Sequence, residues 1–334
     1  MEGCGLSMNL LSSPASGTSP VTEPATPPVS PPIGSALVRT LLAGEFAVTA
    51  EIVPPLSSDP ASLLAKAKPL LGLVDGLNVT DGAGARSHLS SLVAAGLLVR
   101  EGHQPVLQFT TRDRNRIALQ SDVLGAGALG IENILVLGGD DPKAGDQPDA
   151  KPVFDLDTGE FIAMVREMGD SGKLPSGREI EVPPKLFIGA ADTPFDPPAD
   201  WTPDRLASKA AAGAQFVQTQ FCYDVDIVRR YMARLGEAGL TDKLFILLGT
   251  GPIATARSAR WMVKNLWGVI IPDAMIARLE GARDEKAEGH KICIEFIEQV
   301  REIDGVAGVH VMAINQDEAI PDILAAAQAG PAHR

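Results

Sequence analysis

Eight short apolar runs recur along the chain, each with a polar residue at or near its end. They span residues 46–53, 75–80, 105–110, 132–139, 185–190, 215–220, 243–249 and 308–315. All are rich in Val, Ile, Leu and Phe, as is typical of strands buried on both faces of a sheet. The polar residues are Glu51, Thr80, Thr110, Asp140, Asp192, Gln220, Thr250 and Asn315. Because Pro54 and Pro55 lack the N–H that a strand ladder needs, we expect the first strand to finish near Glu51.

The stretches between these runs carry apolar residues at helical spacing, for example residues 61–73, 87–102, 115–130 and 224–239. Regular alternation of strand and helix predicts parallel strands joined by right-handed crossovers. Eight such units favour a closed (β/α)8 TIM barrel over an open sheet. The active site of such a barrel lies at the C-terminal ends of its strands. We therefore expect the eight polar residues to converge on one mouth.

Composition supports one large domain. The 334 residues are 45% hydrophobic, enough for a single barrel, which we place at residues 37–330. Residues 1–36 are instead dominated by Ser, Thr, Pro and Gly and predict a disordered tail with polyproline character. An acid at position 2 makes a poor secretory signal, and no apolar run is long enough to cross a membrane. The sequence predicts a soluble cytoplasmic protein.

The net charge of the chain and the spacing of its potential metal ligands argue against two classes of partner, nucleic acids and metal ions. A net charge of −13 argues against nucleic acid, since binding phosphates along a backbone needs a basic face. The three cysteines and five histidines lack metal-ligand spacing, so we predict no metal site. The acidic loop at Asp140, Asp141, Asp146 and Asp149 does not match an EF-hand calcium loop.

A basic cluster follows the third apolar run. It consists of Arg112, Arg114 and Arg116. Arginines beside a helix N-terminus suit a phosphate-bearing cofactor. The alternative is that they are solvated residues of the first helical turn.

Four motifs in order carry a family resemblance. They are E-x-x-P-P from Glu51, N-V-T-D-G-A at 78–83, G-D-x-P at 139–142 and Q-T-Q-F-C-Y-D at 218–224. Together they resemble the methylenetetrahydrofolate reductase family, flavin-dependent (β/α)8 barrels, from about residue 45 to residue 315. Residues 110–116 and 150–157 are similar to a compact bacterial branch of that family, without a regulatory domain.

The resemblance implies an oxidoreductase that interconverts 5,10-methylenetetrahydrofolate and 5-methyltetrahydrofolate. Its cofactor would be FAD, with FMN as the alternative, and its electron donor NAD(P)H. It implies that Glu51 is the general acid that opens the folate ring, and that Asp140 lies near the flavin pyrimidine edge and contacts the pterin. Gln220 would bind the pterin.

The resemblance also implies a set of cofactor contacts. Thr80 would bond the flavin ring, Gln108 would line it, and Lys209 would support the phosphate–ribose portion. A backbone without side chains lets a flat ligand approach closely, so Gly138 and Gly139 are assigned to the cofactor. From their positions at or near strand ends we add Thr110, Arg112 and Asp192 for the cofactor and Asn315 for the substrate.

The chain departs from the family pattern at several positions. Gly138 replaces an arginine, Asp192 and Asp196 replace an aromatic residue and a histidine, and Ala256 replaces an aromatic residue. These changes leave open whether FAD or FMN is bound, how tightly it is held, and which electron donor is used.

Other interpretations also stay open. The same chemistry could run as methyltetrahydrofolate oxidation in a demethylation pathway. The chain could also be a pterin-dependent methyltransferase barrel, or a non-catalytic subunit that binds a partner reductase. Self-association into a homo-oligomer is a further alternative.

Overall fold

The structure is a computed structural model that describes residues 34–333. These residues form one compact unit. The predicted tail therefore lies outside the described residues as far as residue 33. Ser35 and Ala36, which the sequence placed in that tail, are the N-cap and the first residue of helix α1 (Ala36–Leu42).

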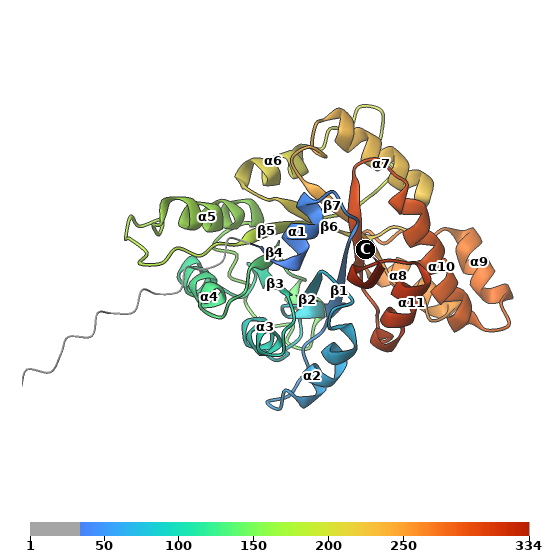
Figure 1. The fold of residues 1–334 in the computed structure, drawn as a ribbon, viewed down its shortest axis with the longest axis horizontal. Coiled ribbons are helices and arrows are strands. Elements are labelled where there is room, and N and C mark those ends of the chain that lie inside the picture. Colours follow the sequence, from blue (N-terminus) through green and yellow to red (C-terminus); the bar gives the residue numbers. More distant parts are fainter. Residues whose placement is uncertain (1–33, 334) are drawn as a thin grey trace, which may run out of the picture. The chain divides into compact units, whose positions relative to one another are not determined.

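Eight parallel strands form a closed barrel in sequence order, and β8 pairs with β1. The strands are β1 (Ala47–Ile52), β2 (Gly76–Val79), β3 (Pro105–Thr110), β4 (Asn133–Leu137), β5 (Phe187–Asp192), β6 (Phe216–Phe221), β7 (Phe245–Thr250) and β8 (Val306–Val311). Helices surround the barrel (Figure 1). The predicted (β/α)8 fold is confirmed.

The surrounding helices are α2 (Ala61–Ala67), α3 (Ser91–Arg100), α4 (Arg116–Ala128), α5 (Thr158–Ser171), α6 (Asp204–Ala212), α7 (Val225–Glu237), α8 (Ala256–Asn265), α9 (Asp273–Gly281), α10 (Glu285–Arg301) and α11 (Ile320–Ala326). Short 3-10 turns lie at η1 (Lys68–Leu70), η2 (Ala83–Ala85), η3 (Pro142–Ala144), η4 (Asp317–Ala319) and η5 (Pro331–His333). The helix expected over residues 61–73 stops early. Pro69 cannot donate a helical hydrogen bond, so the chain tightens into η1 there.

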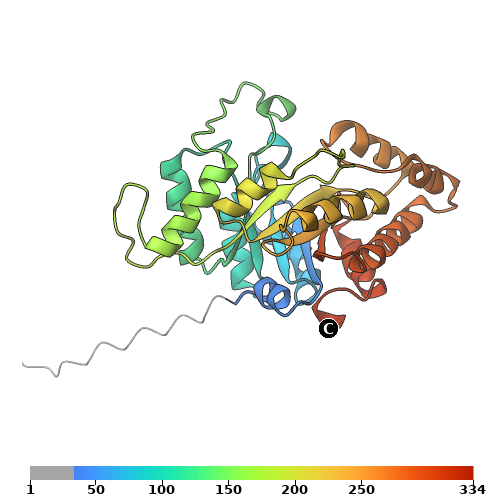
Figure 2. The same ribbon diagram turned by 90° about the horizontal axis from the view of Figure 1, so that it is seen from above.

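Helix α1 closes one end of the barrel. Leu37, Val38 and Leu41 are buried in one apolar cluster with residues from the strand interiors: Ala47, Val106, Leu135, Phe187, Phe216 and Leu247. Ser35 Oγ also donates a hydrogen bond of 2.6 Å to Asn133 Oδ1 on β4. Figure 2 shows α1 at the bottom of the barrel and the loop after β4 rising at the opposite end. The C-terminal mouth is thus the end left for ligands.

The strand ends confirm one expectation and correct another. Strand β1 ends at Ile52, one residue after Glu51, as expected, and Glu51 is in register with Asn78 of β2. Strand β8 ends at Val311, and Asn315 lies beyond it in a turn with a φ of 54°. Asn315 is therefore not a strand-end residue as predicted.

Candidate active site

A cavity of about 580 Å³ fills the C-terminal mouth of the barrel. Most of the predicted site residues line it: Glu51, Thr80, Gln108, Thr110, Gly138, Gly139, Asp140, Asp192 and Gln220. They come from six strands and the loops that follow them. The parallel barrel brings together residues that lie far apart in sequence.

Glu51 lies in the wall of this cavity with its side chain 23% exposed. Gln108 Nε2 donates a hydrogen bond of 2.9 Å to Glu51 Oε2. The Nε2 atom of the buried His310 lies 3.6 Å from the same oxygen. Both contacts use Oε2, so within the described part of the chain Oε1 is left for a ligand.

A hydrogen-bond network holds His310 from below. His310 Nδ1 lies 2.9 Å from Thr49 Oγ1, which also accepts a bond of 2.9 Å from Gln218 Nε2. The other candidate acceptor for the Thr49 hydroxyl is the Val309 carbonyl, at 3.5 Å. Donation to His310 Nδ1 is therefore favoured, and the proton of a neutral imidazole then sits on Nε2, facing Glu51. The sequence singled out neither His310 nor Thr49, because neither has ligand spacing and neither ends a strand.

Asp81 belongs to the motif at 78–83 but was not predicted as a site residue. Its carboxylate accepts bonds from Arg114 at 2.6 and 3.1 Å, from the Thr110 backbone N–H and hydroxyl, and from Ser91 Oγ. Burial raises the pKa of Asp81, but the Arg114 charge and the hydrogen bonds from Arg114 and Thr110 outweigh it, so the pKa lies below its usual value. Asp81 thus fastens the loop after β2 to the end of β3.

All three predicted phosphate-binding arginines have carboxylate partners within the chain. Arg112 is 4% exposed and bonds Asp113, Arg114 bonds Asp81 and Asp122, and Arg116 bonds Asp155. Arg112 also donates to the Asp140 carbonyl at 3.0 Å and lines a separate cavity beside α3. Its predicted cofactor contact stays a prediction, and these arginines already fasten loops to one another.

Two features of the cavity lining suit a flat polar ring. Thr80 Oγ1 is buried and has no hydrogen-bond partner among residues 34–333. At Gly138 an added Cβ would meet no atom within 4 Å, so this stretch of wall is bare backbone facing open space. An unpaired hydroxyl and a stretch of bare backbone in the lining of one cavity suit the edge and face of a heterocycle such as a flavin.

The remaining predicted residues are already positioned by protein contacts. Gln220 Nε2 donates to the Trp267 carbonyl at 3.2 Å, and its Oε1 accepts from the Phe221 N–H. Asp140 Oδ2 accepts from the Gly84 N–H at 2.8 Å. An amide and a carboxylate each keep bonding capacity beyond these contacts. Both side chains can therefore still bind a ligand.

Lys209 and Asp192 line a smaller cavity that adjoins the mouth. Lys209 Nζ donates to the Ala191 carbonyl at 2.5 Å, and burial lowers the pKa of its ammonium group. Asp192 accepts a bond of 2.5 Å from the Tyr231 hydroxyl. Asn315 is exposed in the turn after β8 and does not line the mouth cavity.

The sequence model of methylenetetrahydrofolate reductase matches residues 37–328. The chain belongs to the methylenetetrahydrofolate reductase family. This confirms the family and the enzyme class that the four motifs indicated. The C-terminal mouth of this barrel, the end at which (β/α)8 enzymes carry their active sites, is the candidate active site.

Relatives in the family are distant. A probable methylenetetrahydrofolate reductase (NADPH) from Caenorhabditis elegans is 26% identical over 70% of this chain, which spans only 34% of that protein. The 5,10-methylenetetrahydrofolate reductases of Pectobacterium carotovorum and Escherichia coli are each 24% identical, over 83% and 82% of this chain and 88% of theirs.

A solved structure shares the fold at a TM-score of 0.61 with 13% identity, covering 87% of this chain and 97% of the other. It is an uncharacterized protein from Clostridium thermocellum that binds two copies of 5-methyl-5,6,7,8-tetrahydrofolic acid. Among residues 34–333, no helix is both long and apolar enough to span a membrane. The same residues contain no group of three or more His, Cys, Asp or Glu placed to hold a metal ion.

Proposed function

We propose that this chain is a cytoplasmic, flavin-dependent reductase that converts 5,10-methylenetetrahydrofolate to 5-methyltetrahydrofolate with NAD(P)H as electron donor. The observation that carries the proposal is the Glu51 carboxyl in the mouth cavity, bonded by Gln108 and adjoined by His310. The family membership and the names of the relatives support the same reaction.

Glu51 is the proposed proton donor. A protonated carboxyl facing the cavity can give its proton to a ring nitrogen of methylenetetrahydrofolate, which opens the five-membered ring to a reactive iminium. The carboxylate left behind keeps the Gln108 N–H at 2.9 Å. His310 Nε2, at 3.6 Å, needs only a small shift to stabilise it as well.

Thr80, Gln108 and Asp140 are the proposed flavin contacts, and Gln220 is the proposed pterin contact. A bound flavin would take a hydride from the reduced nicotinamide and deliver it to the folate. A carboxylate at Asp140 would disfavour added negative charge on the flavin ring and so lower its reduction potential. FAD is the proposed form, with Lys209 near its phosphates. The same residues serve the reverse reaction, methyltetrahydrofolate oxidation.

The proposal is tested on purified full-length protein. We expect the visible absorption bands of a flavin, and anaerobic oxidation of NADH or NADPH that depends on added methylenetetrahydrofolate. Glu51→Gln is the matched control, with the flavin bands kept and the folate-dependent turnover lost. A colourless protein that cannot be reconstituted with FAD or FMN and has no such turnover would refute the proposed function.

A further inference from the structure

Trp267 is a large aromatic side chain left unusually open to solvent. It is 76% exposed, in the segment between α8 and α9. The chain has only three tryptophans, and the other strongly exposed one, Trp261, also lines the mouth cavity. An exposed indole at the rim of a cavity is typical of a residue that a ligand covers.

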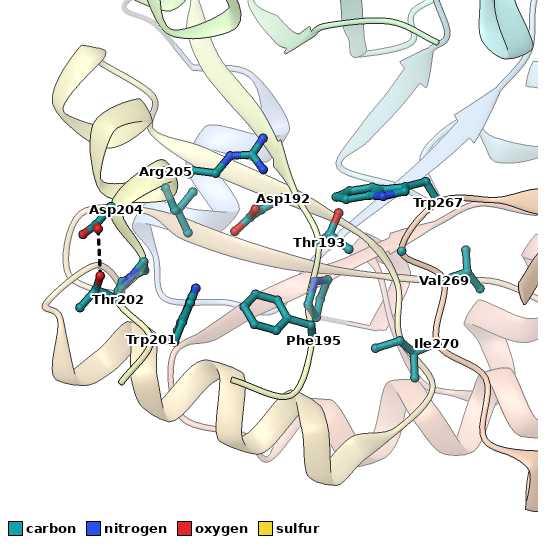
Figure 3. A pocket seen from close by; sticks show the side chains of 14 residues that line it. Asp192, Thr193, Phe195, Trp201, Thr202, Asp204, Arg205, Trp267, Val269 and Ile270 are labelled. Atoms are coloured by element: carbon teal, nitrogen blue, oxygen red, sulfur yellow. Dashed lines mark hydrogen bonds between the residues drawn. The ribbon is translucent and has the colours of Figure 1, made fainter. Parts of the chain in front are cut away.

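The position of Trp267 connects three cavities. It lines the mouth with Glu51, the adjoining cavity with Lys209, and a third pocket with Phe195 and Trp201. Figure 3 shows its indole beside Asp192 and Thr193, with Phe195 and Trp201 across the third pocket. A ring bound in the mouth therefore has Trp267 as one of its neighbours.

The backbone that carries Trp267 is fixed. The Gln220 side chain donates a hydrogen bond to the Trp267 carbonyl. Three residues further on, the Ile270 N–H donates to the Phe221 carbonyl and the Ile270 carbonyl accepts from the Tyr223 N–H, which ties this segment to the end of β6. The next residue, Gly268, packs so closely that an added Cβ would come within 2.4 Å of Thr193. Among residues 34–333, no other aromatic ring stacks on the Trp267 indole. A free ring on an ordered frame binds a flat ligand without the entropic cost of ordering a loop.

We propose that Trp267 is the aromatic wall on which the planar ring of the substrate or co-substrate stacks in the mouth cavity. The ligand chemistry is a flat heteroaromatic ring, and the pterin of folate and the nicotinamide of the donor are its two sources. This inference rests on the proposed function. It makes Trp267 a binding residue that also sets specificity.

The test compares Trp267→Ala and Trp267→Phe with wild type. Val182→Ala is the control, because Val182 is equally exposed at 77% and lies outside the three cavities. Anaerobic calorimetric titration of the protein with its flavin reduced, with 5-methyltetrahydrofolate in one arm and NADH in the other, gives the dissociation constants, because neither ligand can transfer a hydride to a reduced flavin. Circular dichroism confirms that each variant is folded.

We expect Trp267→Ala to weaken binding of at least one ligand about tenfold, the factor that corresponds to one good aromatic contact. Trp267→Phe should recover most of the loss, and the control should match wild type. If only folate binding weakens, the ring that stacks on Trp267 is the pterin. If only NADH binding weakens, the ring is the nicotinamide, and if both weaken, the two rings use Trp267 in turn.

Unchanged dissociation constants in both arms would overturn the inference. If Glu51→Gln still blocked folate turnover in that case, the proposed function would stand and only the role of Trp267 would fall. A wild-type protein that bound neither ligand would overturn both.

Discussion

At the scale of single residues, two carboxylates in the lining of the mouth cavity, Glu51 and Asp140, lie in different settings. Glu51 is a strand residue, 23% exposed, with Gln108 and His310 against one oxygen. Asp140 lies in the exposed loop after β4 and is bonded by the Gly84 N–H. A shielded carboxyl suits proton transfer, and an open one suits electrostatic contact with a ring edge.

Asp140→Asn should raise the flavin midpoint potential. The substitution removes a negative charge but keeps an oxygen that can accept from Gly84. A flavin that is easier to reduce is a poorer hydride donor, so donor oxidation should hold or improve while folate reduction slows. Redox titration of the bound flavin measures the shift. Asp141→Asn, which changes the neighbouring carboxylate that caps η3, is the control and should leave the potential unchanged. An unchanged potential in Asp140→Asn would rule out the tuning role.

At the scale of elements, the loops of the mouth are fastened by buried charge. The Asp81 carboxylate joins the loop after β2 to Thr110 of β3 and to Arg114 of the next loop. Arg114 in turn pairs with Asp122 of α4 at 2.9 Å. The neighbouring Thr80 and Thr110 line the cavity, so this clamp positions the predicted flavin contacts.

Asp81→Asn should destabilise the protein at neutral pH by about 1–3 kcal/mol, because Arg114 and Thr110 lose their hydrogen bonds to a buried carboxylate while Asp122 still pairs with Arg114. The folded-state pKa of Asp81 is depressed, so its contribution to stability is present above the ordinary carboxyl value of 3.8 and is lost as pH falls through the folded pKa. Urea unfolding between neutral and acidic pH measures this.

The wild type should therefore lose part of its stability in acid, and the loss should be shallower in Asp81→Asn. Asp170→Asn is the control. It breaks the exposed Arg166 pair and should change little at any pH. Equal acid dependence in wild type and Asp81→Asn would refute the clamp.

The sequence predicted the elements better than their ends. The apolar runs predicted all eight strands, because a strand that is buried on both faces needs apolar residues throughout its length. The end of β8 was misplaced by the apolar residues Met312, Ala313 and Ile314, which continue the pattern after the ladder stops at Val311. Helix α1 was missed because it is short and adjoins the Pro-rich segment.

The site residues could also be predicted in part, for a similar physical reason. Residues at or near strand ends converged because parallel strands share one mouth, and Glu51 and Gln220 met in one cavity for that reason. His310, Thr49 and Gln218 lie one layer deeper. The register of β1 with β8 brings Thr49 beside His310, and closure of the barrel brings Gln218 of β6 to Thr49 of β1. Arg112, Arg114 and Arg116 looked available in sequence, but their carboxylate partners include residues as distant as Asp155.

At the scale of the whole molecule, the barrel is closed at one end and open at the other. Helix α1 fills the N-terminal end with Leu37, Val38 and Leu41, each under 10% exposed. Because the interior layers of a barrel pack on one another, this plug supports the strands that carry the mouth residues.

Two adjacent leucines of α1 test the plug. Leu41 is 2% exposed and Leu42 is 73% exposed. Leu41→Ala should cost about 2–5 kcal/mol of unfolding free energy through lost burial and the cavity left behind. Leu42→Ala should stay within about 0.5 kcal/mol of wild type. Denaturant unfolding at neutral pH measures both, and similar losses in the two variants would mean that α1 does not plug the barrel.

The central claim is that the mouth cavity reduces methylenetetrahydrofolate with Glu51 as the acid. Rapid mixing of Glu51→Gln under anaerobic conditions, first with NAD(P)H and then with folate, tests it most directly. The amide keeps the shape and removes the transferable proton. Bleaching of the flavin by NAD(P)H should therefore proceed as in wild type, and its reoxidation by methylenetetrahydrofolate should slow by about 100-fold or more. Equal slowing of both steps, or no slowing of the folate step, would contradict the account.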